Sequence, residues 1–156
     1  MTELEALAIL RGPDGAKAAQ AAAALWRMWH QSGDAGLDAL LNEGIAAMER
    51  SDLADAEATF SRLIQAVPEF AEGWNKRATV RYLASDYAGS IGDCEETLSR
   101  NRSHFGALSG QGLCHMALGQ YREAADLFRR TLSVHPHLDS ARSNLRRALS
   151  ELVKWN

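Results

Sequence analysis

The sequence is poor in residues that cross-link a chain or interrupt helices, with two cysteines and three prolines among 156 residues. Two cysteines cannot staple a chain of this length into a disulfide-dependent fold. Long apolar runs are also missing. The mostly alanine stretch Ala18 to Trp26 has only nine residues without a charge, whereas a membrane-spanning helix needs about 20. Because 46% of the residues are hydrophobic and the net charge is only −3, disorder is excluded and a soluble globular protein is predicted.

The first residues lack the features of a secretion signal. Met1 to Leu10 begins with two glutamates and holds few apolar residues, whereas a secretory signal has a basic start and a longer apolar stretch. The chain as given therefore predicts a cytoplasmic protein. If a signal peptide had been removed, the protein would instead be periplasmic.

Motifs for catalysis and for metal binding are missing as well. The sequence has no Gly-x-Ser-x-Gly, no phosphate-binding Gly-x-x-x-x-Gly-Lys-Ser/Thr and no His-Glu-x-x-His. Cys94 and Cys114 are interpreted as small residues between helices rather than as a redox pair. His135 and His137 flank a proline, but they lack the third ligand that a metal site needs. We therefore predict that the protein is not an enzyme and binds neither metal nor cofactor.

The sequence does contain a repeat of 34 residues. Like residues recur 68 positions apart, twice 34, in five pairs: Leu40 and Leu108, Gly44 and Gly112, Ala56 and Ala124, Phe60 and Phe128, Pro68 and Pro136. Midway between the pairs stand Trp74, Ala78, Ser90, Cys94 and Arg102. The first three keep the pattern of one bulky residue followed by two small ones. The chain therefore contains three tandem units, 37–70, 71–104 and 105–138.

These units resemble tetratricopeptide repeats, whose signature is a bulky residue, a small one, small-x-x-x-aromatic and then proline. Two antiparallel helices in each unit can cross closely where the small residues meet, and the proline ends the second helix. The middle unit departs from the signature, because Cys94 replaces the aromatic residue and Arg102 replaces the proline. The resemblance covers 102 of the 156 residues and implies an all-α fold, a right-handed α-α superhelix.

The repeat predicts six helices in three pairs, near 37–50 and 53–66, 71–83 and 87–99, and 105–117 and 121–134. Asp52 and Ser85 are expected to cap second helices, and His104 and His115 are expected in solvent or at caps. Residues 139–156 are predicted to form a capping helix, because Arg146 occupies a slot that is small in the repeats.

Residues 1–36 lie outside the repeat and are predicted to form a helical extension with helices near 2–10 and 16–31, separated by a Gly-Pro-Asp-Gly turn. Trp26 and Trp29 lie three residues apart and therefore share a helix face. The Trp-x-x-Trp-x-x-Ser-Gly stretch is similar to that of a group of small bacterial tetratricopeptide proteins, several of which are exported.

The resemblance implies that the first helices line a concave groove. The residues expected to line it and to contact a partner are Leu41, Ile45, Met48, Asn75, Thr79, Tyr82, Ser109, Leu113 and Met116. Its apolar members, here called the apolar strip, are Leu41, Ile45, Tyr82, Leu113 and Met116. A contiguous exposed apolar strip usually marks a partner, and asparagine can hydrogen-bond to a peptide backbone. The predicted function is therefore a non-enzymatic scaffold that binds a protein or peptide segment in this groove.

Two other ligands could occupy the apolar strip, a chaperone tail or the N-terminal tryptophan helix. One subgroup of the family binds the carboxylate tails of chaperones through lysine, asparagine and arginine side chains at fixed positions. The corresponding residues here are Leu41, Ile45, Lys76, Gly106 and Gly110. Because only Lys76 is basic, binding of a carboxylate tail is not expected. Alternatively, the protein is a structural homo-oligomer whose groove is filled by the N-terminal tryptophan helix of its own or a neighbouring chain. The unexplained glycine at 110 favours an occupied groove, since interior helical glycines cost about 1 kcal/mol relative to alanine.

The C-terminal region is rich in arginine. The residues concerned are Arg129, Arg130, Arg142, Arg146 and Arg147. Because the whole chain is acidic and aromatic residues are not interleaved with these arginines, the pattern indicates a solvated cap rather than a nucleic-acid site. Neither nucleic acid nor a membrane is expected as a partner.

Overall fold

Residues 1–155, which the computed structural model describes, form nine helices and no strand. The helices are α1 (Glu3–Arg11), α2 (Gly15–Trp29), α3 (Ala35–Glu49), α4 (Leu53–Ala66), α5 (Ala71–Leu83), α6 (Tyr87–Arg100), α7 (Phe105–Ala117), α8 (Tyr121–Val134) and α9 (Asp139–Trp155). Every expected helix is present, with its ends within two residues of the prediction. The predicted all-α fold is confirmed.

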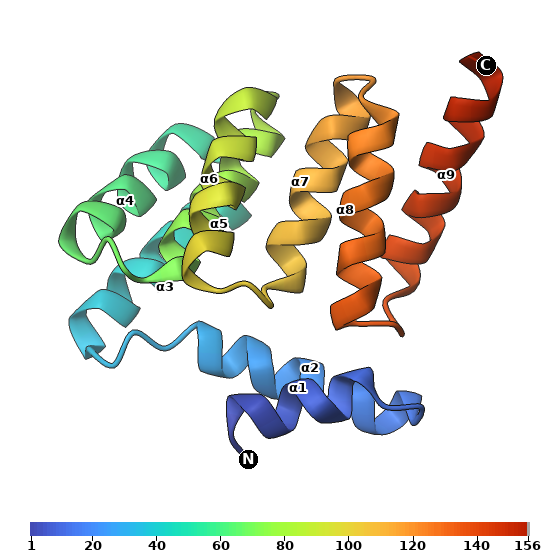
Figure 1. Cartoon of the computed structure of the whole chain (residues 1–156). Helices are drawn as coiled ribbons and strands as arrows, with labels where there is room; N and C mark the ends of the chain where they lie inside the picture. The colour runs from blue at the N-terminus through green and yellow to red at the C-terminus, as the bar shows by residue number, and fades with distance from the viewer. Residues whose placement is uncertain (156) are drawn as a thin grey trace.

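Helices α3 to α8 stack as three pairs, α3 with α4, α5 with α6 and α7 with α8, and each pair packs on the next (Figure 1). The cores of the pairs depend on the small residues of the repeat. A Cβ added to Gly112 would lie 2.7 Å from the ring of Phe128, and the first pair has the same arrangement. In the middle pair the Ser90 hydroxyl donates to the Ala78 carbonyl oxygen at 2.7 Å. The small residues thus let the two helices of a pair approach closely.

The turn inside each pair also repeats every 34 residues. Ser51, Ser85 and Gly119 have left-handed backbone angles, with φ of 62°, 63° and 72°. Asp52 and Asp86 follow two of them and cap the second helices with their carboxylates. The expectation for Asp52 is confirmed, whereas the cap assigned to Ser85 is wrong. Ser85 reverses the chain, and the cap falls on the next residue.

The N-terminal extension forms a helical hairpin that lies across the lower ends of α7 and α8 (Figure 1). Its apolar face shares a core with the third repeat, made of Ala6, Leu7, Leu10, Ala18, Ala21, Leu25, Trp29, Phe105, Leu108, Leu127 and Val134. Although α1 and α2 precede the first repeat in sequence, they are therefore anchored to the third.

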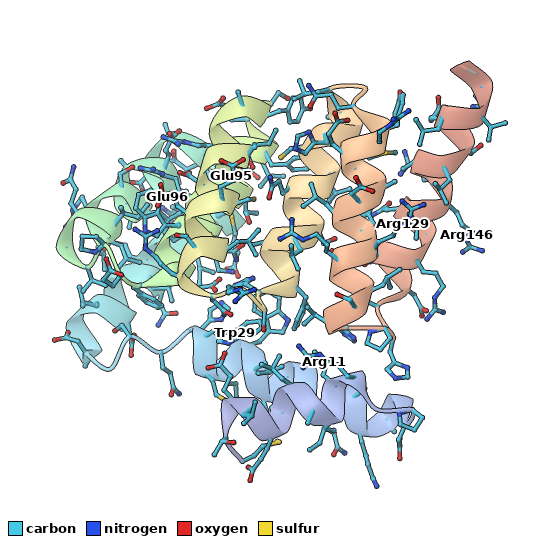
Figure 2. The ribbon with its side chains drawn as sticks, viewed as in Figure 1. Arg11, Trp29, Glu95, Glu96, Arg129 and Arg146 are labelled. Carbon is cyan, nitrogen blue, oxygen red and sulfur yellow. The ribbon has the colours of Figure 1, made fainter. Side chains whose placement is uncertain are left out.

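At the other end of the array, α9 packs on α8. Ala148 is buried against Phe128 and the small residues of α8. Arg146 projects into solvent on the outer side (Figure 2). Along residues 1–155, no helix combines the length and the apolar character needed to cross a membrane.

Candidate functional site

Two adjoining hollows lie along α5, α7 and α9. The first, of about 280 Å³, lies between α5 and α7 and is lined by Asn75, Ala78, Thr79, Tyr82, Leu83, Ser90, Cys94, Gly106, Gly110 and Leu113. The second, of about 430 Å³, lies between α7 and α9 and is lined by Tyr82, Leu113, Met116, Ala117, Tyr121, Arg147, Ser150, Glu151 and Lys154. Because Tyr82 and Leu113 line both hollows, the two form one continuous depression, here called the groove.

Five of the nine residues predicted to contact a partner line this groove. Asn75 and Thr79 lie in the first hollow, Tyr82 and Leu113 lie between the two, and Met116 lies in the second. The Tyr82 ring packs edge-on against Tyr87, with 5.7 Å between centroids. This contact fixes the Tyr82 ring where the two hollows meet.

The other four predicted residues lie elsewhere. Leu41 is 1% exposed in the core of the first repeat, so its place on the groove wall is corrected. Its neighbours in that core come from α4 and α5, which cover the face of α3 that carries it. Ile45 and Met48 pack against the same core. Ser109 is half-buried and lines neither hollow.

Two glycines of α7 differ in what faces them. A Cβ on Gly106 would lie 2.6 Å from the Trp26 ring, whereas a Cβ on Gly110 would meet only the Cys94 sulfur, at 3.9 Å. The absent side chain at 106 is thus explained by the seating of α2. The absent side chain at 110 leaves space in the first hollow.

The two tryptophans of α2 do not lie over the apolar strip. Trp26 packs edge-on against Phe105 with centroids 5.3 Å apart, and Trp29 stacks on His104 at 4.7 Å. The Trp29 indole also donates to the Glu3 carboxylate at 3.0 Å. Figure 2 shows Trp29 at the junction of the hairpin with the repeats. The chain's own tryptophan helix therefore packs at the start of α7 and does not cover Tyr82, Leu113 and Met116, which are half-buried.

A buried carboxylate, Glu72, joins this junction to the groove. Glu72 is 1% exposed. One of its oxygens accepts from Asn75 Nδ2 at 2.9 Å and lies 3.7 Å from His30 Nε2 and 3.9 Å from Lys76 Nζ. The other accepts from His104 Nε2 at 2.9 Å. Sequence reasoning missed this cluster.

The hydrogen bonds of His104 assign its tautomer. Its Nδ1 accepts the Ala107 backbone N–H at 3.0 Å, so the proton of the neutral ring lies on Nε2 and is donated to Glu72. His104 thus caps α7, which confirms the expectation of a capping role. The other expectation is wrong, because the ring is fully buried under α2.

The charge of Glu72 is stabilised where it lies. Burial acts to raise the pKa of its carboxyl, but the hydrogen bonds from His104 and Asn75, together with the nearby His30 imidazole, outweigh that effect and hold the pKa below its ordinary value. The ionised carboxylate in turn fixes the orientation of Asn75. The Asn75 side-chain oxygen accepts no hydrogen bond from the described residues, so it remains as an acceptor on the groove wall.

A second polar network holds α5 against α4 and α6. Arg77 donates twice to the buried Asp93 carboxylate, each bond at 2.9 Å. Arg81 bridges Asp93 at 3.1 Å and Glu57 at 2.9 Å. Burial acts to lower the pKa of Arg81, but the two carboxylates raise it overall. These ion pairs fix the helix from which Asn75 projects into the groove.

The two cysteines are buried and not bonded to each other. Burial raises the pKa of the Cys94 thiol, and nearby Cys114 adds to the shift. Burial likewise raises the pKa of Cys114, whose thiol contacts the Ser90 hydroxyl at 3.2 Å. Both therefore stay protonated and pack as small residues. Over the described part of the chain, no three His, Cys, Asp or Glu residues gather in a way that could hold a metal ion.

The C-terminal arginines do not form one patch. Arg129 pairs with Asp126 and Arg142 with Asp139, each within its own helix. Arg147 borders the second hollow of the groove, and Arg130 borders a different hollow between α6 and α8.

The repeats of this chain match those of known proteins. A tetratricopeptide repeat family model matches residues 41–104, 93–137 and 109–154. A TPR repeat-containing protein of Rhizobium etli is 31% identical over 126 residues, which cover 81% of this chain and 61% of the relative. Tetratricopeptide repeat protein 36 of Danio rerio is 30% identical over 96 residues, 59% of this chain and 51% of the relative. The chain thus spans between half and two thirds of the length of these relatives.

Solved structures share the fold at lower identity. The first TPR of Spaghetti (RPAP3), bound to the HSP90 peptide SRMEEVD, superimposes with a TM-score of 0.74 at 23% identity, covering 75% of this chain and 93% of that one. The Sgt2 TPR domain of Aspergillus fumigatus gives a TM-score of 0.75 at 18% identity, covering 79% and 83%.

Proposed function

The chain belongs to the tetratricopeptide repeat family, and on that premise we propose that it is a non-enzymatic scaffold that binds a protein segment in the groove. The observation that carries the proposal is the partly exposed apolar lining shared by the two hollows, Tyr82 and Leu113, with Met116 beside them. Similar folds support it, since one is bound to an HSP90 peptide and another is a complex with pHsp70.

The lining favours a partner segment with apolar side chains and available backbone N–H groups. Burying one such side chain contributes about 1.5–3 kcal/mol. The Asn75 side-chain oxygen and the Thr79 hydroxyl oxygen, whose proton is donated to the Asn75 carbonyl at 3.2 Å, offer acceptors to the ligand backbone. Glu72 holds Asn75 in place beforehand, which reduces the entropy lost on binding.

A carboxylate tail is a poor fit for the same surface. Of the slots that would carry a tail clamp, only Lys76 is basic, and its ammonium group lies 3.9 Å from the buried Glu72 carboxylate. Gly106 and Gly110 offer no side-chain donor. The proposed ligand is therefore recognised by its apolar side chains rather than by a terminal carboxylate.

The test is a pull-down from lysate of the native organism, followed by affinity measurement with the recovered protein. We expect Tyr82→Ala and Leu113→Ala each to weaken binding about tenfold, the loss that corresponds to about 1.4 kcal/mol. Leu118→Ala is the matched control, because Leu118 is exposed at the end of α7 and lines neither hollow. Unchanged affinity in both groove variants would contradict the proposal.

The alternative, a homo-oligomer whose groove is filled by a neighbouring chain's tryptophan helix, predicts a different result. Light scattering would then give a mass that rises with concentration, and Tyr82→Ala would lower that mass. A monomer at high concentration rules the alternative out.

A further inference from the structure

A larger hollow of about 790 Å³ lies between α6 and α8, the second helices of adjacent pairs. Part of α7 lines it, and the end of α1 borders it. Its lining residues on α7, Leu108 and Gln111, differ from those that line the groove. The hollow is therefore a separate site, here called the α6–α8 hollow, and its size is in the range of ligand pockets, about 300–1,000 Å³.

Three arginines from three separate segments border this hollow. Arg11 ends α1, Arg102 lies between α6 and α7, and Arg130 lies on α8. None of the three forms an ion pair with a described residue. Figure 2 shows Arg11 beneath the lower ends of α7 and α8. One carboxylate, Glu95, also borders the hollow, so positive charge predominates.

A largely buried side chain presents its amide to the same hollow. Gln111 is only 8% exposed, lines the hollow and makes no side-chain hydrogen bond to the described residues. Among the described residues, only His135 Nδ1 is a fully buried side-chain polar atom without a partner, so the Gln111 amide reaches the hollow and is open to a ligand there. Ser99 and Ser133 already donate their hydroxyl protons to helix carbonyls, so Gln111, the Ser103 hydroxyl and the arginines are the donors open to a ligand.

We propose that the α6–α8 hollow binds a short acidic segment of a protein partner. The guanidinium groups suit carboxylates, which they can engage with two parallel hydrogen bonds. The Gln111 amide can both donate to and accept from a peptide backbone. The half-buried Leu98 offers apolar surface to the methylene groups of glutamate side chains.

The chemistry favours a peptide over a nucleic acid. No aromatic side chain lines the hollow on which a base could stack. The chain as a whole carries a net charge of −3, which disfavours a long polyanion. A short acidic segment needs only the local positive charge.

The experiment titrates the whole ¹⁵N-labelled chain with a blocked octapeptide of alternating glutamate and alanine. The matched control peptide has glutamine for glutamate. We expect the glutamate peptide to shift the side-chain NH₂ signals of Gln111 and the Nε signals of Arg102 and Arg130, and the glutamine peptide to leave them unmoved. Because the contacts are partly exposed, the affinity falls as salt rises.

Two variants of equal charge locate the site. Arg102→Gln with Arg130→Gln should weaken glutamate-peptide binding about tenfold. Arg102→Gln with Arg129→Gln should weaken it only about threefold, because Arg129 pairs with Asp126 and does not line the hollow. Tyr82→Ala should bind the glutamate peptide as the wild type does, which separates this site from the proposed groove.

Three results would overturn the proposal. The first is Gln111 signals that do not move at saturating peptide. The second is an equal loss of affinity in the two double variants, which would indicate general electrostatic attraction. The third is tighter binding of a single-stranded oligonucleotide, or of a phosphoserine peptide, than of the glutamate peptide, since carboxylate recognition is then wrong.

Discussion

Gly106 and Gly110 lie one turn apart on α7, yet one faces a filled junction and the other an open groove. The Trp26 ring occupies the space beside Gly106, while Gly110 has only the Cys94 sulfur near it. At the junction, side chains from α2, α5 and α7 surround a buried carboxylate. At the groove, the described chain buries Tyr82, Leu113 and Met116 only in part. The same residue type thus serves internal packing at one position and leaves space at the next.

The largest expected effect is the loss of Glu72. Glu72→Ala leaves the buried His104 Nε2–H and the Asn75 amide without their acceptor. We expect the free energy of unfolding to fall by about 3 kcal/mol, measured by urea denaturation. Glu96→Ala is the control, because Glu96 pairs with Arg100 at the surface and such pairs contribute about 0–1 kcal/mol. Equal losses would mean that the junction does not depend on the buried carboxylate.

Gly106→Ala tests the packing side of the same junction. The new methyl group would have to displace Trp26, whose ring is held edge-on by Phe105 and His104. Overpacking of this kind costs about 1–3 kcal/mol. We expect the free energy of unfolding, measured by urea denaturation, to fall by that amount, and we expect the tryptophan fluorescence to change. Unchanged stability would show that α2 shifts freely on α7.

Acid titration examines the charge of Glu72. The pKa of Glu72 is lower in the folded chain than in the unfolded one, where the pKa of glutamate is about 4.3. The charge of Glu72 therefore stabilises the fold above that pH. The contribution is lost as the pH falls through the lower, folded value. We expect wild-type stability to fall more steeply below about pH 4.3 than that of Glu72→Gln, by at most about 1.4 kcal/mol per pH unit. Parallel acid limbs would contradict an ionised Glu72.

The smallest effect on stability is expected at Gly110, which faces open space in the groove. Gly110→Ala places a methyl group where space exists and removes a flexible residue from a helix. We expect the stability to rise by about 0.5–1 kcal/mol, while affinity for a groove partner falls because the methyl group enters the first hollow. Calorimetry measures the first effect and titration with the recovered partner the second. A loss of stability here would remove the contrast with Gly106.

Much of the array could be predicted because the information is local or periodic. Small residues recurring every 34 positions define where helices cross, and the same spacing places Ser51, Ser85 and Gly119 in the left-handed turns. The exact cap was missed at Asp86, since a serine and an aspartate stand side by side there and only the backbone angle distinguishes them.

The groove was predicted less completely. The period places first-helix residues on one surface, which is why Tyr82, Leu113 and Met116 come together. It does not say how deeply α4 and α5 cover α3, and this cover buries Leu41. Glu72 was missed because acidic residues are common in the first turn of any helix, and its partner His104 lies 32 residues away.

The sequence by itself determined the repeat, the helices and the close crossings within each pair, since all of these follow from side-chain size and spacing between neighbouring elements. Only the tertiary structure decided where the extension before the repeats would dock. It seats α1 and α2 on the third repeat, buries Glu72 beneath them and leaves the groove open. A period fixes contacts between adjacent units, but a segment outside the period is placed by the shape and the polar groups of the surface that receives it.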